Sequence, residues 1–282
     1  MHKLNRGTDM NDMERFGVEL SRFDIVDIDE MLTYEDTDEN RVKEISEDLV
    51  RRNTLINPVL YDPKIKLLID GNHRVNAFKL LNINHIATFN VNYFTNEVSV
   101  GNWYRFLSGI EVGQLDNILH LLLTSKYTLP DCPGFYLEIE YPDGATERIP
   151  FSNSLELSAF LKILHDSVIS AGGRVELSPE KEIHQNDTRN SLVLSTTPTI
   201  GKTEVFNTAR SSKTFCFQVN RHLINNRPLG IDLPLAFFAL RKTDTILKYR
   251  EHISNSRRIS TGKGRWHHGR FYEENTILFH YS

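Results

Sequence analysis

Apolar and polar positions in the first hundred residues follow two periods, one of about two residues and one of about 3.6. Uninterrupted or alternating apolar runs, which are typical of β-strands, cover residues 23–28, 57–61, 65–69 and 85–94. Val42, Ile45 and Leu49 mark one face of a helix from about residue 39 to 52, with Thr37 and Asp38 as capping candidates. A second helix is predicted where apolar residues recur at helical spacing over 77–81. The order strand, helix, strand, strand, helix, strand predicts a compact α/β unit that ends near residue 95.

The second half of the chain has a less regular pattern. Residues 115–126, 155–169 and 243–253 are predicted helices, and the apolar face of the middle one carries Leu157, Phe160, Leu161, Leu164 and Val168. Two alternating runs, 135–141 and 145–151, flank Pro142-Asp143-Gly144 and predict a hairpin. Further strands are expected at 175–177, 192–194 and 214–219, and residues 180–191 are expected to form an exposed loop.

These elements predict an α/β (α+β) protein with a flexible arm at 1–20, a first domain at 21–130 and an α/β second domain at 131–282. The chain has 282 residues and a net charge of −4, an ordinary globular balance that disfavours a protein built to coat nucleic acid. No apolar run approaches the ~18 residues of a membrane span, and the polar N-terminus lacks a signal core. With Cys132 and Cys216 as its only cysteines, the chain has no disulfide framework. We therefore expect a cytoplasmic protein without membrane partners, and the sequence leaves its oligomeric state open.

The densest cluster of chemically active side chains lies between the strand at 65–69 and the helix that follows it. The chain there reads Asp70, Gly71, Asn72, His73 and Arg74. The first N–H groups of a helix lack internal partners and favour anions, and Arg74 adds donors suited to phosphate. An ordinary turn followed by a helix cap would use similar residues, so the pattern alone leaves both interpretations open.

Glu35 is a second candidate, because it lies in a polar loop ahead of the first helix, where a carboxylate base would be accessible. The alternative is that it is one of several surface acids in this loop. Trp103 and Tyr104 form an aromatic pair that belongs either to a pocket or to the core. Near the C-terminus, residues 255–271 combine basic residues with glycines, as an anion-binding loop, a solvated basic tail or a nucleic-acid contact would.

The stretch Asp-Gly-Asn-His-Arg resembles the nucleotide-binding signature of the ParB/sulfiredoxin superfamily. It is most similar to the Asp-Gly-x-His-Arg of the free L-serine kinases. Sulfiredoxins need a cysteine where this chain has Asn72, and ParB proteins carry a Gly-Glu-Arg-Arg box. The order of the Glu35 loop, the Pro-containing strand and the signature is also similar to that of the kinases.

The resemblance implies a ParB/sulfiredoxin-like N-terminal domain whose cleft is closed by the C-terminal domain. It implies a kinase that transfers a phosphoryl group from ADP or ATP, with Mg²⁺, to the hydroxyl of free L-serine or a close analogue. Glu35 is implied as the base, with His73 as a second catalytic residue. Asp70, Gly71, Asn72, His73 and Arg74 are implied to bind the nucleotide phosphates, and Asp70 also the metal.

By the same resemblance, Trp103 and Tyr104 line the substrate pocket. The segment from 256 to 268 looks like a diverged form of the kinases' Lys-Thr-Thr-Arg-His segment, which assigns phosphate contacts to Lys263, Arg265 and His267. Arg265 follows Lys263 by two residues, where the family pattern has three. Two alternatives remain: a ParB-type nucleotide-dependent DNA-binding regulator without kinase activity, and a kinase whose acceptor is a modified amino acid or a peptide. The sequence assigns no role to residues 131–235.

Overall fold

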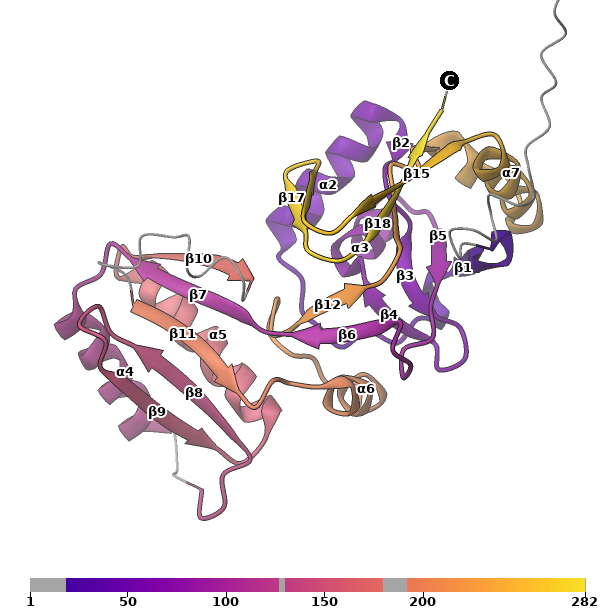
Figure 1. Cartoon of the computed structure of the whole chain (residues 1–282). Helices are drawn as coiled ribbons and strands as arrows, with labels where there is room; N and C mark the ends of the chain where they lie inside the picture. The colour runs from indigo at the N-terminus through magenta and orange to yellow at the C-terminus, as the bar shows by residue number, and fades with distance from the viewer. Residues whose placement is uncertain (1–18, 127–129, 180–191, 282) are drawn as a thin grey trace, which may run out of the picture. The chain divides into compact units, whose positions relative to one another are not determined.

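The computed structural model describes residues 19–126, 130–179 and 192–281, which divide into two compact units (Figure 1). The first unit contains the chain up to Thr33, Thr37–Ser99 and Leu223–Ser282, and the second contains Tyr34–Asp36 and Val100–His222. This division differs from the predicted consecutive domains 21–130 and 131–282, because segments near the C-terminus pair with segments near the N-terminus. Leu233, for example, pairs with Leu55. The predicted arm at 1–20 lies outside the described residues, apart from its last two positions.

The first unit is built on a four-stranded sheet of order β1-β5-β3-β4. β1 runs antiparallel to β5, β5 parallel to β3, and β3 antiparallel to β4. The strands are β1 (Phe23–Asp27), β3 (Val59–Asp62), β4 (Leu67–Asp70) and β5 (His85–Asn90). Two helices, α2 (Glu39–Arg52) and α3 (Asn72–Leu80), pack on each other. Short 3-10 turns lie at Leu20–Arg22 and Ile28–Glu30.

Sequence signals set the ends of α2. The Asp38 carboxylate accepts hydrogen bonds from the backbone N–H groups of Asn40 and Arg41, at 2.8 and 3.2 Å, and so caps the helix. The helix ends at Asn53, which takes a left-handed conformation with φ 52°. The predicted helix over 39–52 is therefore confirmed.

The C-terminal part of the first unit adds a helix and several short strands. A three-stranded sheet has the order β13-β18-β15, β16 pairs with β17, and β14 pairs with β2. Their bounds are β2 (Thr54–Leu55), β13 (Arg227–Leu229), β14 (Leu233–Pro234), β15 (Arg257–Gly262), β16 (Arg265–His267), β17 (Arg270–Tyr272) and β18 (Thr276–His280), with a 3-10 helix at Leu235–Ala239 and α7 at Lys242–Ser254. α7 packs on β1, where the buried rings of Phe23 and Tyr249 meet edge to face at 5.6 Å.

The second unit is a five-stranded antiparallel sheet of order β10-β7-β11-β8-β9. The strands are β7 (Trp103–Ser108), β8 (Phe135–Glu140), β9 (Thr146–Phe151), β10 (Arg174–Pro179) and β11 (Leu192–Thr197), and the helices are α4 (Val112–Lys126), α5 (Ser154–Ser170) and α6 (Lys202–Arg210). The apolar face predicted for the helix at 155–169 is buried in α5, so that prediction is confirmed. β6 (Val98–Gly101) and β12 (Arg221–Ile224) pair with each other, and each includes a point where the chain passes between the units.

Some sequence predictions were wrong. Residues 214–219 form no strand and make only an isolated bridge between Phe215 and Glu35. The glycine-bearing segment at 255–271 is not a loop but contains β15, β16 and β17, because its glycines take positive φ in the turns between the strands. The predicted loop at 180–191 lies outside the described residues. Within the described part of the chain, no helix is both long and apolar enough to span a bilayer.

Candidate functional site

The junction between β4 and α3 has the strand-to-helix geometry that the sequence predicted. Asp70 ends β4, Gly71 is the N-cap of α3, and Asn72, His73 and Arg74 form the first helical turn. Gly71 has φ 115°, and a Cβ there would lie 2.5 Å from Cγ1 of Val59. Only glycine fits both the conformation and the space, so the backbone of this turn is fixed by β3 on one side and by the helix on the other.

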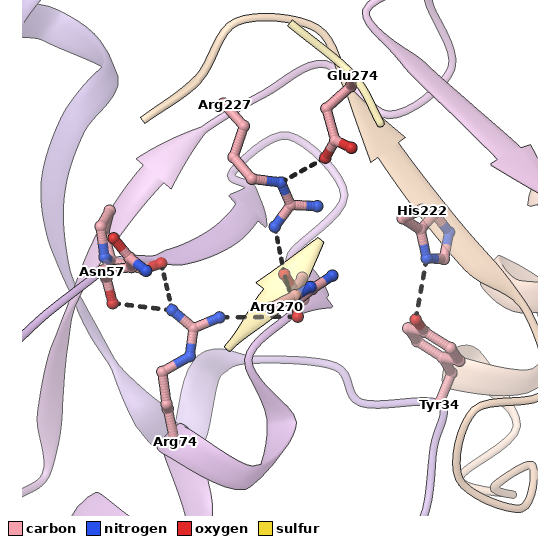
Figure 2. A network of polar contacts seen from close by, with 9 residues as sticks. Tyr34, Asn57, Arg74, His222, Arg227, Arg270 and Glu274 are labelled. Atoms are coloured by element: carbon pink, nitrogen blue, oxygen red, sulfur yellow. Dashed lines mark hydrogen bonds and ion pairs between the residues drawn. The ribbon is translucent and has the colours of Figure 1, made fainter. Parts of the chain in front are cut away.

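Three guanidinium groups surround the Asp70 carboxylate. They belong to Arg74, Arg227 and Arg270, which are labelled in Figure 2. Arg227 donates from Nη1 to Oδ2 of Asp70, and Nη1 of Arg270 lies 3.4 Å from the same oxygen. Nη2 of Arg74 lies 3.6 Å from Oδ1. Arg227 also pairs with Glu274 at 2.8 Å. Three cations thus face two carboxylates, which leaves one net positive charge at the start of α3.

These arginines are held in place by further contacts. Nη1 of Arg74 donates to the backbone oxygens of Asn57 and Pro58 at 2.8 and 2.7 Å. The Tyr272 ring lies 5.6 Å from the guanidinium carbon of Arg227 and 5.1 Å from that of Arg270. A cluster of ordered guanidinium groups beside a helix N-terminus is suited to binding phosphate oxygens.

The Asp70 carboxyl stays ionised in this setting. Burial alone raises its pKa, but the charges of the three surrounding arginines outweigh burial and hold the pKa well below its ordinary value. A carboxylate that already faces three cations does not fit the prediction that Asp70 holds Mg²⁺, because the arginines would repel the metal. Nor do the described residues bring three His, Cys, Asp or Glu side chains together in a group that could hold a metal ion.

His73 links the junction to helix α2. Its Nε2 atom lies 3.2 Å from the backbone nitrogen of Asp38 and accepts that N–H, so the ring is neutral with its proton on Nδ1. Burial lowers the pKa of His73, which favours the same neutral form. His73 therefore supports the start of α2, and its proposed catalytic role would have to use Nδ1.

The three C-terminal residues assigned by resemblance occupy two different settings. Lys263 is exposed in the turn between β15 and β16. Arg265 and His267 lie on β16, opposite Tyr272 and Arg270 of β17. Directly opposed residues of an antiparallel pair share one face, so Arg265 and His267 share the face of the hairpin that carries Arg270. Arg265 and His267 thus share a face with an arginine that reaches Asp70, whereas Lys263 lies in the turn outside this pairing.

Glu35 belongs to the short segment Tyr34–Asp36 of the second unit, although the chain before and after this segment belongs to the first. It accepts a hydrogen bond from the backbone N–H of Gln218. Its neighbours are held as well: the Tyr34 hydroxyl lies 3.2 Å from Nδ1 of His222 (Figure 2), and Asp36 pairs with Lys162 at 2.8 Å. The loop that carries Glu35 is therefore ordered by contacts within the second unit.

Trp103 and Tyr104 are adjacent on β7 and point to opposite faces of the sheet, since successive strand residues alternate. Both are partly exposed. The guanidinium carbon of Arg221 lies 5.4 Å from the centre of the Trp103 ring. Only one of the two aromatic side chains can therefore face a ligand on a given side of β7.

The sequence analysis missed residues that complete both clusters. Arg227 and Glu274 had no local signal, because each becomes informative only beside Asp70, which is 157 residues from Arg227. Arg270 was part of the basic C-terminal segment but received no role. Gln218 was placed in a predicted strand, whereas its left-handed backbone, with φ 56°, directs its N–H to Glu35.

The fold is mixed α/β, and the comparisons with known proteins find the same fold in solved structures. SbnI with a C-terminal truncation, from Staphylococcus aureus, is similar with a TM-score of 0.65 and 14% identity, over 83% of this chain and 96% of that one. A free serine kinase in complex with AMP is similar with a TM-score of 0.60 and 20% identity, over 76% of this chain and 92% of that one. A conserved hypothetical protein from Pyrococcus furiosus has a TM-score of 0.60 and 19% identity. Identities this low establish the fold alone.

One curated relative is similar in sequence. An ATP-dependent L-serine kinase from Staphylothermus marinus is 23% identical over 114 residues, which are 39% of this chain and 44% of that protein. The match thus spans less than half of the relative's length. No family model matches the chain.

Five partly or fully buried histidines predict how the stability of the protein depends on pH. Burial lowers the pKa of each of them, and His267, next to the charges of His268 and Arg265, falls to about 4. The five are His73, His85, His165, His252 and His267. Below the ordinary histidine pKa of about 6.5 the unfolded chain binds more protons than the folded chain, so stability falls as pH decreases.

We therefore expect the thermal unfolding midpoint to drop between pH 6.5 and 4. A His267→Asn variant should show a shallower drop, and replacement of the exposed His120 on α4 is the control for loss of a histidine. Midpoints measured at pH 7.5, 6.0 and 4.5 by circular dichroism check this. A constant midpoint over that range would contradict the expectation.

Proposed function

We propose that the protein is a nucleotide-dependent kinase that transfers a phosphoryl group from ADP or ATP to the hydroxyl of free L-serine or a close analogue. The observation that carries the proposal is the cluster of Arg74, Arg227 and Arg270 around Asp70 at the start of α3. The fold shared with free serine kinases and the distant sequence similarity to an L-serine kinase support it.

The first unit would bind the nucleotide. Phosphoryl transfer needs little covalent chemistry from a protein, but it needs positive charge and fixed donors around the phosphate oxygens. The N–H groups at the start of α3 and the three guanidinium groups supply both. Asp70 would align the arginines, because its two oxygens are shared among them. Arg265 and His267, on the same face of the hairpin as Arg270, are the candidates for further phosphate contacts.

The second unit would activate the acceptor. A carboxylate can take the proton of a hydroxyl as that oxygen attacks phosphorus. Glu35 is partly exposed and is oriented by the Gln218 N–H, as such a base requires. Trp103, with its ring against Arg221, or Tyr104 on the opposite face of β7, is the candidate for lining the acceptor site.

Magnesium is part of the proposal only as the companion of the nucleotide. Mg²⁺ keeps several waters and commonly binds through substrate phosphates. The described residues do not gather three His, Cys, Asp or Glu side chains around a metal position, so the assay supplies Mg²⁺ together with the nucleotide.

Phosphorus NMR of the purified protein with Mg²⁺, L-serine and either ATP or ADP in separate tubes tests the proposal. We expect a new phosphomonoester signal with at least one donor, and the donor that gives it is thereby identified. The control contains every component except L-serine. Nucleotide binding without a new signal would contradict serine kinase activity. Salt-sensitive binding to duplex DNA in a shift assay would then favour a ParB-type regulator.

A further inference from the structure

Arg105 is a buried cation in the second unit with an unusual environment. It lies on β7, opposite Leu177 of β10 and Leu194 of β11, and only 4% of its surface is exposed. Its Nη2 donates to the backbone oxygen of Gln218 at 2.9 Å. In the part of the chain that the structure describes, no carboxylate oxygen lies within 4.0 Å of its nitrogens.

Arg227, in the first unit, is an arginine that is buried to the same extent as Arg105 and can be compared with it. Arg227 is also 4% exposed, but it pairs with two carboxylates, Asp70 and Glu274. Burying a charge costs free energy unless a partner compensates it. Arg105 donates to a neutral carbonyl, and the Cys216 thiol and the more distant Glu35 carboxylate offset only part of the cost of burying its charge, so the guanidinium can still accommodate a closer anion.

The position of Arg105 relative to Glu35 indicates which anion Arg105 would bind. One residue, Gln218, joins the two: its N–H donates to the Glu35 carboxylate, and its carbonyl oxygen accepts from Arg105. The backbone nitrogen and oxygen of a single residue are only about 3 to 4 Å apart. Glu35 and Arg105 are thus close enough for one small molecule to reach both.

The segment that leads to Gln218, residues 215–217, is also held in place by hydrogen bonds. The backbone N–H of Cys216 donates to Oγ of the buried Ser158 at 2.7 Å, and the Phe215 N–H donates to the backbone oxygen of Tyr34 at 2.7 Å. Burial lowers the pKa of Arg105, partly offset by Cys216 and Glu35. The arrangement keeps the guanidinium and the carboxylate at a constant spacing.

We propose that Arg105 binds a free carboxylate of the acceptor, which limits the substrates to small hydroxy carboxylates such as a free hydroxy amino acid. The proposal rests on the proposed function. A carboxylate two carbons from the hydroxyl, as in L-serine, would place the hydroxyl at Glu35 while the guanidinium fork takes the carboxylate. A serine within a peptide chain has no such carboxylate and would be rejected.

Calorimetric titration of the full chain with L-serine and with L-serinamide tests the assignment. The amide has nearly the same shape but lacks the negative charge. We expect the wild-type protein to bind L-serine about 10- to 100-fold more tightly than the amide, as loss of a charge-assisted contact predicts. Arg105→Met should bind both weakly and equally. Arg174→Met, which alters an exposed arginine on β10, is the matched control and should retain the preference.

Arg105→Lys is a second variant, to be used if Arg105→Met does not fold. It keeps the positive charge and should retain part of the preference for L-serine. Equal wild-type affinity for the two ligands, binding of neither, or a full preference in Arg105→Met overturns the assignment. If the wild-type protein bound both ligands equally and Arg105→Met lost the same affinity for each, Arg105 would only position Gln218.

Turnover separates this assignment from the proposed function. Carboxylate-dependent binding without phosphoryl transfer would refute the kinase proposal and leave Arg105 assigned. Transfer to L-serine and L-serinamide with equal kcat/KM would support the kinase and refute the role of Arg105.

Discussion

Replacement of Glu35 with glutamine should reduce turnover with L-serine by about 10²- to 10⁴-fold, the usual contribution of a general base. Glutamine keeps the size of the side chain and can still accept the Gln218 N–H, so the loop should keep its conformation. Nucleotide binding should change less than about twofold, because the proposed phosphate contacts all lie in the first unit. The phosphomonoester signal over time gives turnover, and titration with AMP gives nucleotide affinity.

Asp38→Asn is the matched control, since it makes the same carboxylate-to-amide change three residues further along. Asparagine caps helices as well as aspartate does, so α2 should be preserved. If Glu35→Gln turned over as fast as the wild-type protein, Glu35 would not be the base. Equal losses in both variants would point to disturbance of the loop instead.

Replacement of Arg227 with methionine should destabilise the protein by about 3 to 5 kcal/mol, the cost of removing one partner from a buried ion pair. Two carboxylates are affected: Glu274 loses the guanidinium that it contacts at 2.8 Å, and Asp70 loses its closest cation. We also expect weaker nucleotide binding, because the cluster would fall from three cations to two. Equilibrium denaturation with urea measures the first effect, and AMP titration measures the second.

Arg41→Met is the control for the loss of an arginine from an ion pair. Arg41 pairs with Glu44 at 2.7 Å, but both side chains are about 60% exposed, so the loss should cost no more than about 1 kcal/mol. The double variant Arg227→Met, Glu274→Gln should recover part of the lost stability, since it removes an uncompensated carboxylate. If Arg227→Met cost no more than Arg41→Met, the cluster would not be a buried network.

Much of the local structure could be predicted from the sequence, because it depends on side-chain periodicity and capping. Helix α2 has the predicted bounds, with Asp38 as its cap, and the apolar face of α5 is the predicted one. The junction from Asp70 to Arg74 also lies where expected, between a buried strand and a helix. Each of these features is set by residues within a few positions of each other.

Local patterns failed where a segment is shaped by distant contacts. Residues 214–219 are apolar enough for a strand, yet they pair with the loop that carries Glu35 through an isolated bridge at Phe215. Gln218 takes a left-handed conformation that periodicity does not reveal. The glycines at 262, 264 and 269 were taken as signs of a loop, whereas they form the turns of short strands. In both cases tertiary pairing determined the conformation.

The sequence by itself determined helix α2, the apolar face of α5, the glycine that the β4–α3 turn requires and the candidate residues Glu35 and Asp70–Arg74. Only the tertiary structure decided that Arg227 and Arg270 join Asp70, that Glu35 belongs to the second unit, and that Arg105 is buried with no carboxylate of the described residues within 4.0 Å. The physical reason is that charge compensation depends on distance in space. A buried cation and its partner can be separated by any number of residues along the chain, so no local pattern encodes the pair.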